Sequence, residues 1–379
     1  MKRFTVFIFV LFFAFSFNVS AENYSAEDFI KEQAELSGAE DLEKNLPEET
    51  REYFNKNEIA PADGNWINSF NIVKIFGDLW QTVIDKIKAP LSFMGLILAV
   101  VLISGALNSL ETGITHTTLN FAVTAISAAA VTAPLLSVIN SSVAVMQSVS
   151  LFMAAFVPVF GTLLATSGHV ATSVSMRGLL LGATQVVELI AIHLIVPLMC
   201  GYLSVSVASG VSPLLSKTTI SASIKNLSFW IMSLVTTVFL GILSIQTTVN
   251  ASADTLTIRT AKFIIGSTVP MAGTVLSEAL STVTASLGIL KTSVAIYGVV
   301  ACGVILLPLL LELLLWRLCL GVTAIACDLL SAETTGKLLR SIDGAISVLC
   351  GIILLTGALF IISLSVLVTV SKVCIGLVL

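Results

Sequence analysis

Ionisable residues inside long apolar stretches are the first candidates for chemistry in this chain: Glu188, His193 and Glu278. A charge at the centre of a bilayer costs about 3 kcal/mol on insertion scales, so such residues usually face a cavity or one another. Glu188 and His193 are five residues apart, about 140° around a helix, so one helix does not bring them together. We therefore predict Glu188 and Glu278, which lie deepest in their spans, as pathway residues. The alternative is a buried glutamate that is protonated or hydrogen-bonded to a neighbouring helix.

Prolines and glycines inside apolar runs form a second group of candidates, because a broken membrane helix offers backbone groups to a ligand. The segment at residues 157–164 (VPVFGTLL) recurs at 269–276 (VPMAGTVL), and VINSS at 138–142 resembles TVNAS at 248–252. These matches predict an internal duplication. Its broken-helix candidates are Pro158 with Gly161 and Pro270 with Gly273, and Pro197 and Pro308 are candidates for kinks in the partner helices. The alternative is that the prolines only shape helix packing, since membrane helices tolerate them.

The elements that carry these residues are long apolar stretches. Hydrophobic residues make up 56% of the chain, charged residues only 11%, and the mean hydropathy is +1.00. A soluble domain has about 25% charged residues, so most of this chain must face lipid or other helices. Spans of about 20 apolar residues are expected near 91–110, 118–139, 143–166, 178–208, 227–249, 266–290, 293–316 and 344–371. The sequence predicts an all-α polytopic membrane bundle of about seven to nine spans over residues 89–379.

The duplication also predicts how the spans are arranged. Repeat units of about 118–208 and 227–316 would contain three spans each, so the units would insert in opposite orientations. This inverted three-helix repeat is the plan of many transporters, which bind their ligand near the midplane of the bilayer. Small residues such as Gly178, Gly182 and Ala183 favour close helix approach. The bundle could therefore also form a homo-oligomer.

The N-terminal part of the chain has the features of an exported segment. Lys2 and Arg3 precede an apolar run, and Val19 and Ala21 are small residues at the positions of a cleavage site, which predicts a signal peptide at 1–21. An uncleaved signal anchor is the alternative. Residues 22–88 hold fifteen acidic and seven basic residues and contain signals for short polar helices. Both interpretations make residues 22–88 an acidic extracytoplasmic segment.

This segment ends in an amphipathic stretch at residues 65–88. Trp66, Phe70 and Trp80 recur with other apolar residues every three or four positions, and polar residues fall between them. Such a helix is suited to lying among lipid headgroups. Packing against the protein's own bundle and docking of a partner are the alternatives.

Several functional classes find no support in the sequence. The chain has no basic patch, so nucleic-acid binding is not expected. It also has no phosphate-binding loop, zinc-protease motif, nucleophile elbow or dinucleotide fingerprint. The six cysteines all lie in apolar stretches without a CxxC pair, which favours packing over a disulfide or a metal site. We expect no enzyme, no cofactor and no metal.

The layout resembles the stage III sporulation protein AE family. The resemblance covers essentially the whole chain and rests on the acidic head, PLSFMGL at 90–96, NSS at 140–142, FVPVFGTL at 156–163 and the copy that begins at Val269. It implies a component of a channel-like complex between mother cell and forespore during engulfment, needed for forespore development. The implied partners are other stage III sporulation membrane proteins, ring-forming proteins and an ATPase. The head would then lie between the two membranes around the forespore.

Three functions therefore remain open from the sequence. The chain could be a conducting membrane subunit of such a complex, a stand-alone secondary transporter, or a non-conducting anchor for ring-forming partners. A conducting role predicts that Glu188 and Glu278 face a shared cavity. An anchor predicts that the head retains the partners while the body only inserts into lipid.

Overall fold

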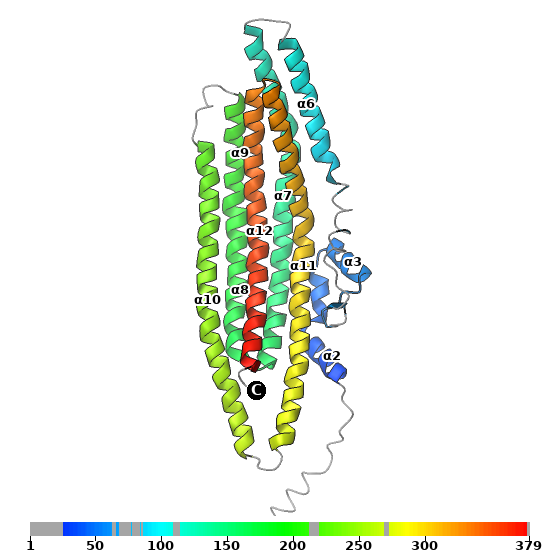
Figure 1. The fold of residues 1–379 in the computed structure, drawn as a ribbon, viewed down its shortest axis with the longest axis vertical. Helices are drawn as coiled ribbons and strands as arrows, with labels where there is room; N and C mark the ends of the chain where they lie inside the picture. The colour runs from blue at the N-terminus through cyan, green and yellow to red at the C-terminus, as the bar shows by residue number, and fades with distance from the viewer. Residues whose placement is uncertain are drawn as a thin grey trace, which may run out of the picture.

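The computed structural model describes residues 26–62, 66–67, 77, 84, 86–108, 114–211, 220–268 and 273–376. Within these residues every regular element is helical, and the helices run as a long bundle with a small N-terminal head at its side (Figure 1). In chain order they are α2 (Ala26–Ser37), the 3-10 helix η1 (Glu40–Asn45), α3 (Glu48–Lys56), α6 (Lys88–Asn108), α7 (Ile114–Thr166), α8 (Val170–Ile190), the π-helical η2 (Ala191–Ile195), α9 (Val196–Val211), α10 (Ile220–Thr268), α11 (Gly273–Leu329) and α12 (Glu333–Gly376).

Five stretches of the described helices are long and apolar enough to cross a membrane. They are Phe121–Thr166, Val170–Ser209, Ala222–Gln246, Ser286–Leu329 and Glu333–Ser365, and the shorter apolar stretch Lys88–Ser104 lies in α6. The predicted all-α membrane bundle is therefore confirmed. The helices are also long: the 57 residues of α11 span about 86 Å, against about 30 Å for the hydrocarbon core of a bilayer.

The expected count of about seven to nine spans is not confirmed. The spans expected at 118–139 and 143–166 lie in the single helix α7, and those at 266–290 and 293–316 lie almost wholly in α11. The polar residues between the first two do not interrupt the helix. Ser142 is buried, and its hydroxyl donates a hydrogen bond to the Val138 carbonyl at 2.8 Å, four residues earlier. This bond satisfies the hydroxyl inside the helix, so no loop is needed.

The inverted three-helix repeat is likewise not confirmed. Unit 118–208 is formed by α7 and the continuous run α8–η2–α9, and unit 227–316 by α10 and α11. Each unit thus contains two long helical rods, and two units of two crossings would insert in the same orientation. Pro158 lies inside α7, whereas Pro270 lies outside the described residues. The internal sequence match itself stays a prediction.

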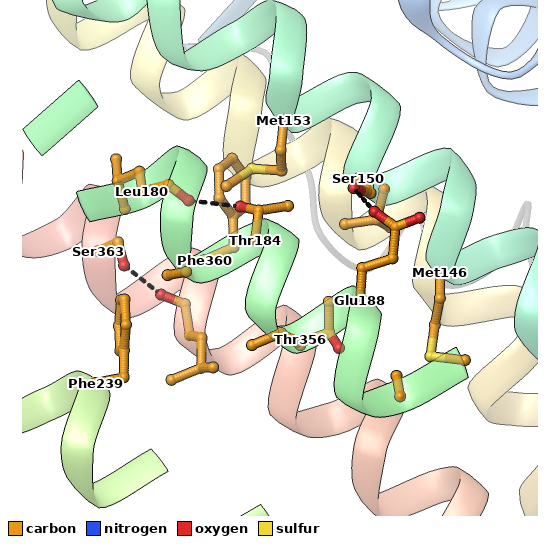
Figure 2. Close-up of a pocket in the computed structure, with 15 residues that line it drawn as sticks. Met146, Ser150, Met153, Leu180, Thr184, Glu188, Phe239, Thr356, Phe360 and Ser363 are labelled. Atoms are coloured by element: carbon orange, nitrogen blue, oxygen red, sulfur yellow. Dashed lines mark hydrogen bonds between the residues drawn. The ribbon is translucent and has the colours of Figure 1, made fainter. Parts of the chain in front are cut away.

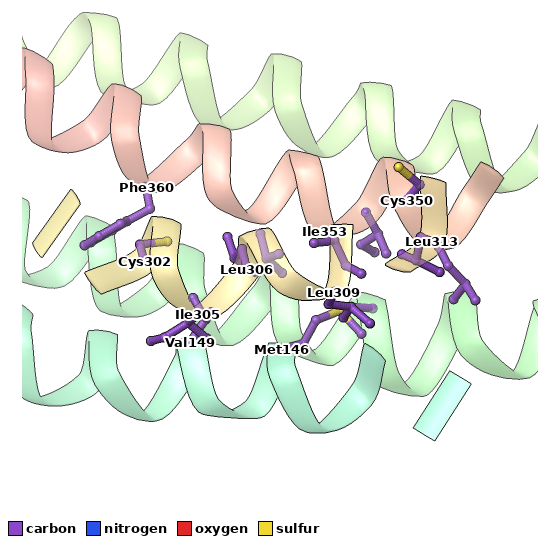
Figure 3. Close-up of a cluster of buried hydrophobic side chains, with 14 of the residues drawn as sticks. Met146, Val149, Cys302, Ile305, Leu306, Leu309, Leu313, Cys350, Ile353 and Phe360 are labelled. Carbon is purple, nitrogen blue, oxygen red and sulfur yellow. The ribbon is translucent and has the colours of Figure 1, made fainter. Parts of the chain in front are cut away.

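The centre of the bundle is formed by α7, α11 and α12. Figure 3 shows side chains of these three helices packed between one another, among them Met146, Leu309 and Ile353. Glycines allow the closest approaches. A Cβ atom on Gly298 of α11 would lie 2.5 Å from the ring of the fully buried Phe156 of α7, and one on Gly357 would lie 2.8 Å from Leu306. These glycines therefore set the distances between the central helices.

The head packs on the outer face of α7 and α11. The helix α2 contacts both of them, η1 contacts α7 and α3 contacts α11. The ring of Phe54 is fully buried and meets Tyr297 edge-on, with centroids 5.0 Å apart. The Ser293 hydroxyl donates to the Pro61 carbonyl at 3.0 Å. These contacts fix the head on the bundle, whereas its extracytoplasmic location stays a prediction and the signal peptide lies outside the described residues.

Only part of the predicted interfacial helix at 65–88 is described. Trp66 is 6% exposed, and its indole N–H donates to the Ala60 carbonyl at 2.7 Å. Phe70 and Trp80 lie outside the described residues. At Trp66 the chain therefore packs into its own core, while the proposed contact of this stretch with lipid stays a prediction.

Candidate functional site

A cavity of about 40 Å³ lies between α7, α8, α10 and α12. Its walls are mostly apolar, with Met146 and Met153 from α7, Leu180 from α8, Phe239 from α10 and Phe360 from α12 (Figure 2). Five polar side chains also line it: Ser150, Thr184, Glu188, Thr356 and Ser363. The four helices thus form a small, partly open apolar space with a few polar groups, as small-ligand sites commonly do.

Glu188 is the charged residue among the described lining of this cavity. The side chain is half-buried and accepts a hydrogen bond from the Ser150 hydroxyl of α7 (Figure 2). Glu188 thus lines a cavity, whereas its predicted role as a pathway residue stays a prediction. The alternative that we considered, a glutamate hydrogen-bonded to a neighbouring helix, describes the same contact. Ser150 and Glu188 are 38 residues apart in the sequence, so only the α7–α8 hairpin brings them together.

The other hydroxyls of the cavity are satisfied by their own helices. Thr184 donates to the Leu180 carbonyl at 2.8 Å, Thr356 donates to Ile352 at 2.9 Å, and Ser363 donates to Leu359. Each hydroxyl oxygen keeps lone pairs that can still accept a hydrogen bond. These three groups are therefore acceptors for a ligand, whereas the carboxylate supplies the charge.

A π-helical segment lies directly after Glu188. The Val196 N–H bonds to the Ala191 carbonyl, five residues earlier, and Ala191 lines the cavity. Pro197 follows; it has no N–H to donate and its ring would clash with the carbonyl four residues before it. The π turn relieves this conflict, and π-bulges are frequent at functional sites. The kink expected at Pro197 thus takes the form of one widened turn.

His193 lies in this π segment but does not belong to the cavity. Its side chain is exposed, and it is absent from the described lining residues. Glu278 belongs to the start of α11, but its side chain lies outside what the structure describes. The predicted shared cavity of Glu188 and Glu278 is therefore not tested.

The broken helix expected at Pro158 and Gly161 is not observed, because α7 continues through both residues to Thr166. Pro308 also lies inside a continuous helix, α11, and Gly273 is the first residue of that helix. Membrane helices tolerate such prolines when neighbouring groups satisfy the freed carbonyls. The break predicted at Pro158 and Gly161 is therefore wrong, whereas the break at Pro270 and Gly273 and the kink at Pro308 stay predictions.

Gly161 has a different role, which is to let a side chain cross the helix. A Cβ atom on Gly161 would overlap the side chain of Arg177 from α8, whose guanidinium donates to the Thr162 hydroxyl at 2.8 Å. The Gly161 carbonyl also accepts a bond from the Ser173 hydroxyl at 2.6 Å. The glycine therefore holds the lower part of the α7–α8 hairpin together.

Sequence reasoning missed the polar contacts that join distant helices. The carboxylate of Asp254 on α10 is buried and accepts bonds from the backbone N–H groups of Ala171 at 2.9 Å and Thr172 at 3.2 Å. These N–H groups belong to the first turn of α8, where they otherwise lack partners within the helix. Ion pairs join Lys86 to Glu312 and Arg317 to Asp343. The serine and threonine residues near Asp254 in the sequence do not indicate that its carboxylate contacts the start of α8.

No group of three or more His, Cys, Asp or Glu side chains in the described part of the chain could hold a metal ion. The described cysteines are free thiols, and most of them are buried. The site is thus a carboxylate, hydroxyls and apolar walls. That arrangement suits binding or passage of a small solute.

A family model for Stage III sporulation protein AE matches residues 62–371. The chain belongs to the stage III sporulation protein AE family. Membership implies a role in sporulation. The match covers the whole cavity and every helix from α6 to α11, whereas α2, η1 and α3 of the head precede it.

One curated relative supports the same assignment. Stage III sporulation protein AE of Bacillus subtilis (strain 168) is 29% identical over 161 residues, which is 42% of this chain and 40% of that protein. The alignment thus spans well under half of the relative's length. No solved structure matches the chain.

Proposed function

We propose that this chain is an integral membrane subunit of a channel complex that links mother cell and forespore during engulfment and that forespore development needs. Its family membership and its apolar helices support this role. The observation that carries the proposal is the cavity between α7, α8, α10 and α12, with Glu188 as its charged group. A bundle whose helices only packed within the membrane would have no need of a carboxylate at that position, because burying a charged group there is costly.

In this proposal the protein lies in the mother-cell membrane that faces the forespore, with residues 22–88 on the extracytoplasmic side. Its partners are other stage III sporulation membrane proteins, ring-forming proteins and an ATPase subunit. The docked head supports a partner-binding role for this segment, because its contacts with α7 and α11 hold it at a fixed place on the bundle. The exposed acidic side chains of the head, such as Glu48, Glu49 and Glu52, would then face the partners.

The test is a Glu188→Gln substitution in a sporulating host that carries the substituted gene as its only copy. We expect late forespore transcription and heat-resistant spores to fall well below wild type, while the partners still co-purify with the protein. Glu333→Gln is the matched control, because Glu333 is exposed at the start of α12 and far from the described cavity lining. Normal sporulation of the Glu188→Gln strain would overturn a conducting role for this cavity.

A stand-alone secondary transporter is the second candidate, because the same cavity suits it. It predicts uptake of a solute by the purified protein in liposomes without partners. The complex subunit predicts no such uptake until the partners are added.

The docked head also fits a third function, that of a non-conducting anchor for ring-forming partners. An anchor predicts that deletion of residues 22–88 abolishes partner retention while the Glu188→Gln strain sporulates normally. The conducting subunit predicts that each of the two changes lowers spore formation on its own.

A further inference from the structure

We infer that the Glu188 cavity binds a small alkylammonium ion, an ammonium group that carries one or two carbon atoms. This inference deepens the proposed function and rests on it, since it names the class of solute for the same cavity. It is argued from the charge, the walls and the size of the cavity.

The charge of the cavity calls for a cation. Glu188 is held by one hydrogen bond from Ser150, and the described lining contains no lysine, arginine or histidine to balance the carboxylate. Charges interact strongly where water is scarce, because the effective dielectric constant is low. A bound cation would supply the missing counter-charge, and an ammonium N–H group could also donate to the carboxylate oxygen.

The walls of the cavity favour an organic cation over a metal ion. In Figure 2, Phe239 and Phe360 lie on the side of the cavity away from Glu188, next to Leu180 and Ser363. Hard metal cations need about six oxygen ligands around one point. The hydroxyls of Thr184, Thr356 and Ser363 are instead spread along the walls, and most of the remaining lining is apolar. An alkyl group that extends away from the carboxylate fits such walls.

The size of the cavity limits the ligand to a few heavy atoms. The volume is about 40 Å³, and one water molecule needs about 10–15 Å³ of such volume, which leaves room for about three heavy atoms. Ethylammonium has three heavy atoms and places its charge at one end. Because very small ligands gain little binding free energy in total, we expect a dissociation constant of about a millimolar.

The experiment uses the full-length protein in nanodiscs and ethylammonium as the probe. Saturation-transfer NMR would detect transfer from the protein to the ethyl protons, and ethanol, which is neutral and of similar size, would serve as the control ligand. We expect a saturable signal for ethylammonium with wild type, a loss of about tenfold in affinity for Glu188→Gln, and no change for Glu333→Gln. Ethanol should give the same weak signal in all three proteins.

A second variant covers the case in which Glu188→Gln does not fold. Phe239→Leu keeps the carboxylate but removes part of the apolar wall, so we expect ethylammonium to bind more weakly than to wild type but still more tightly than ethanol. Equal signals for ethylammonium and ethanol would overturn the inference, and so would displacement by sodium at lower concentrations than by ethylammonium. If ethylammonium does not bind but the Glu188→Gln strain still fails to sporulate, the proposed function stands and only the solute class is wrong.

Discussion

Glu188 and Gly161 show how two residues that stand out in the sequence act in different ways in the structure. Glu188 faces a cavity and contacts Ser150 of the neighbouring helix. Gly161, which the sequence suggests as a helix breaker, lies inside a continuous helix beneath the side chain of Arg177. A carboxylate in an apolar run has few stable environments, so its sequence signal is strong. A glycine has many stable environments, and its role depends on which side chain of a neighbouring helix packs over it.

Gly161→Ala tests the crossing at this residue. The added methyl group would overlap the Arg177 side chain, so the arginine must leave and its 2.8 Å bond to Thr162 is lost. We expect the free energy of unfolding in mixed micelles to fall by about 1–3 kcal/mol. Gly178→Ala is the matched control, since nothing lies within 4 Å of its added Cβ atom. Equal stability of the two variants would show that Arg177 does not cross α7 at Gly161.

The partner of Glu188 could not be predicted from the sequence. Ser150 belongs to a stretch with several serines, and nothing in its immediate neighbours distinguishes it from Ser148. Only the packing of α7 on α8 selects Ser150. The position of the carboxylate was therefore predictable from local hydropathy, whereas the composition of its site depends on long-range contacts.

At the scale of the helices, the sequence predicts their type well but not their length. Apolar composition indicates helices correctly from residue 88 onward. The polar breaks, however, look like loops in a hydropathy profile and are helical in the structure, as at Ser142 in α7. A serine hydroxyl can bond to the carbonyl four residues before it, so it does not force the chain out of a helix. This is why the expected spans merge.

Asp254 joins α10 to the start of α8, and its removal should loosen that contact. In Asp254→Ala the N–H groups of Ala171 and Thr172 lose their acceptor in a buried place. We expect a loss of about 2 kcal/mol in the free energy of unfolding, measured in mixed micelles. Asp254→Asn should lose less, since the amide oxygen still accepts one bond. Asp41→Ala, at an exposed ion pair with Lys44, should leave stability almost unchanged.

The contact of α7 with α11 depends on Gly298. In Gly298→Ala the added methyl group would lie 2.5 Å from the Phe156 ring, and this ring is fully buried and cannot move aside. We expect the thermal midpoint to fall, with a loss of about 1–3 kcal/mol. Gly303→Ala in the same helix has open space around its Cβ atom and should be tolerated. A Gly298→Ala protein as stable as wild type would contradict the close approach of these helices.

At the scale of the whole molecule, the head and the bundle form one connected core. Leu42, Leu46 and Phe54 of the head are buried in the same cluster as the central residues of α7 and α11. The sequence separates the head by its acidic charge and suggests an independent segment. Its few apolar residues nevertheless point inward, and they pack against α7 and α11.

Phe54→Ala should release the head from the bundle. The substitution removes a fully buried ring that packs edge-on against Tyr297, and such changes cost about 3–5 kcal/mol. We expect residues 26–62 to become sensitive to limited proteolysis while the bundle stays resistant. Leu36→Ala is the control, because Leu36 is 70% exposed and contributes little to the packing. Equal protease resistance of Phe54→Ala and wild type would contradict a docked head.

The π turn at η2 sets the direction in which the side chains of the following helix, α9, point around the helix axis. Val187, Ala191, Ile195 and Met199 are all buried, and successive members are four residues apart. A regular α-helix turns 400° in four residues, so three such steps would rotate the buried stripe by about 120° away from its partners. The extra residue in the π turn cancels much of this drift. Removing Ile192 would restore a regular helix at the cost of turning Met199 and Tyr202 out of the core by about 100°, so the irregular turn is what allows a single rod to keep one face inward along its whole length.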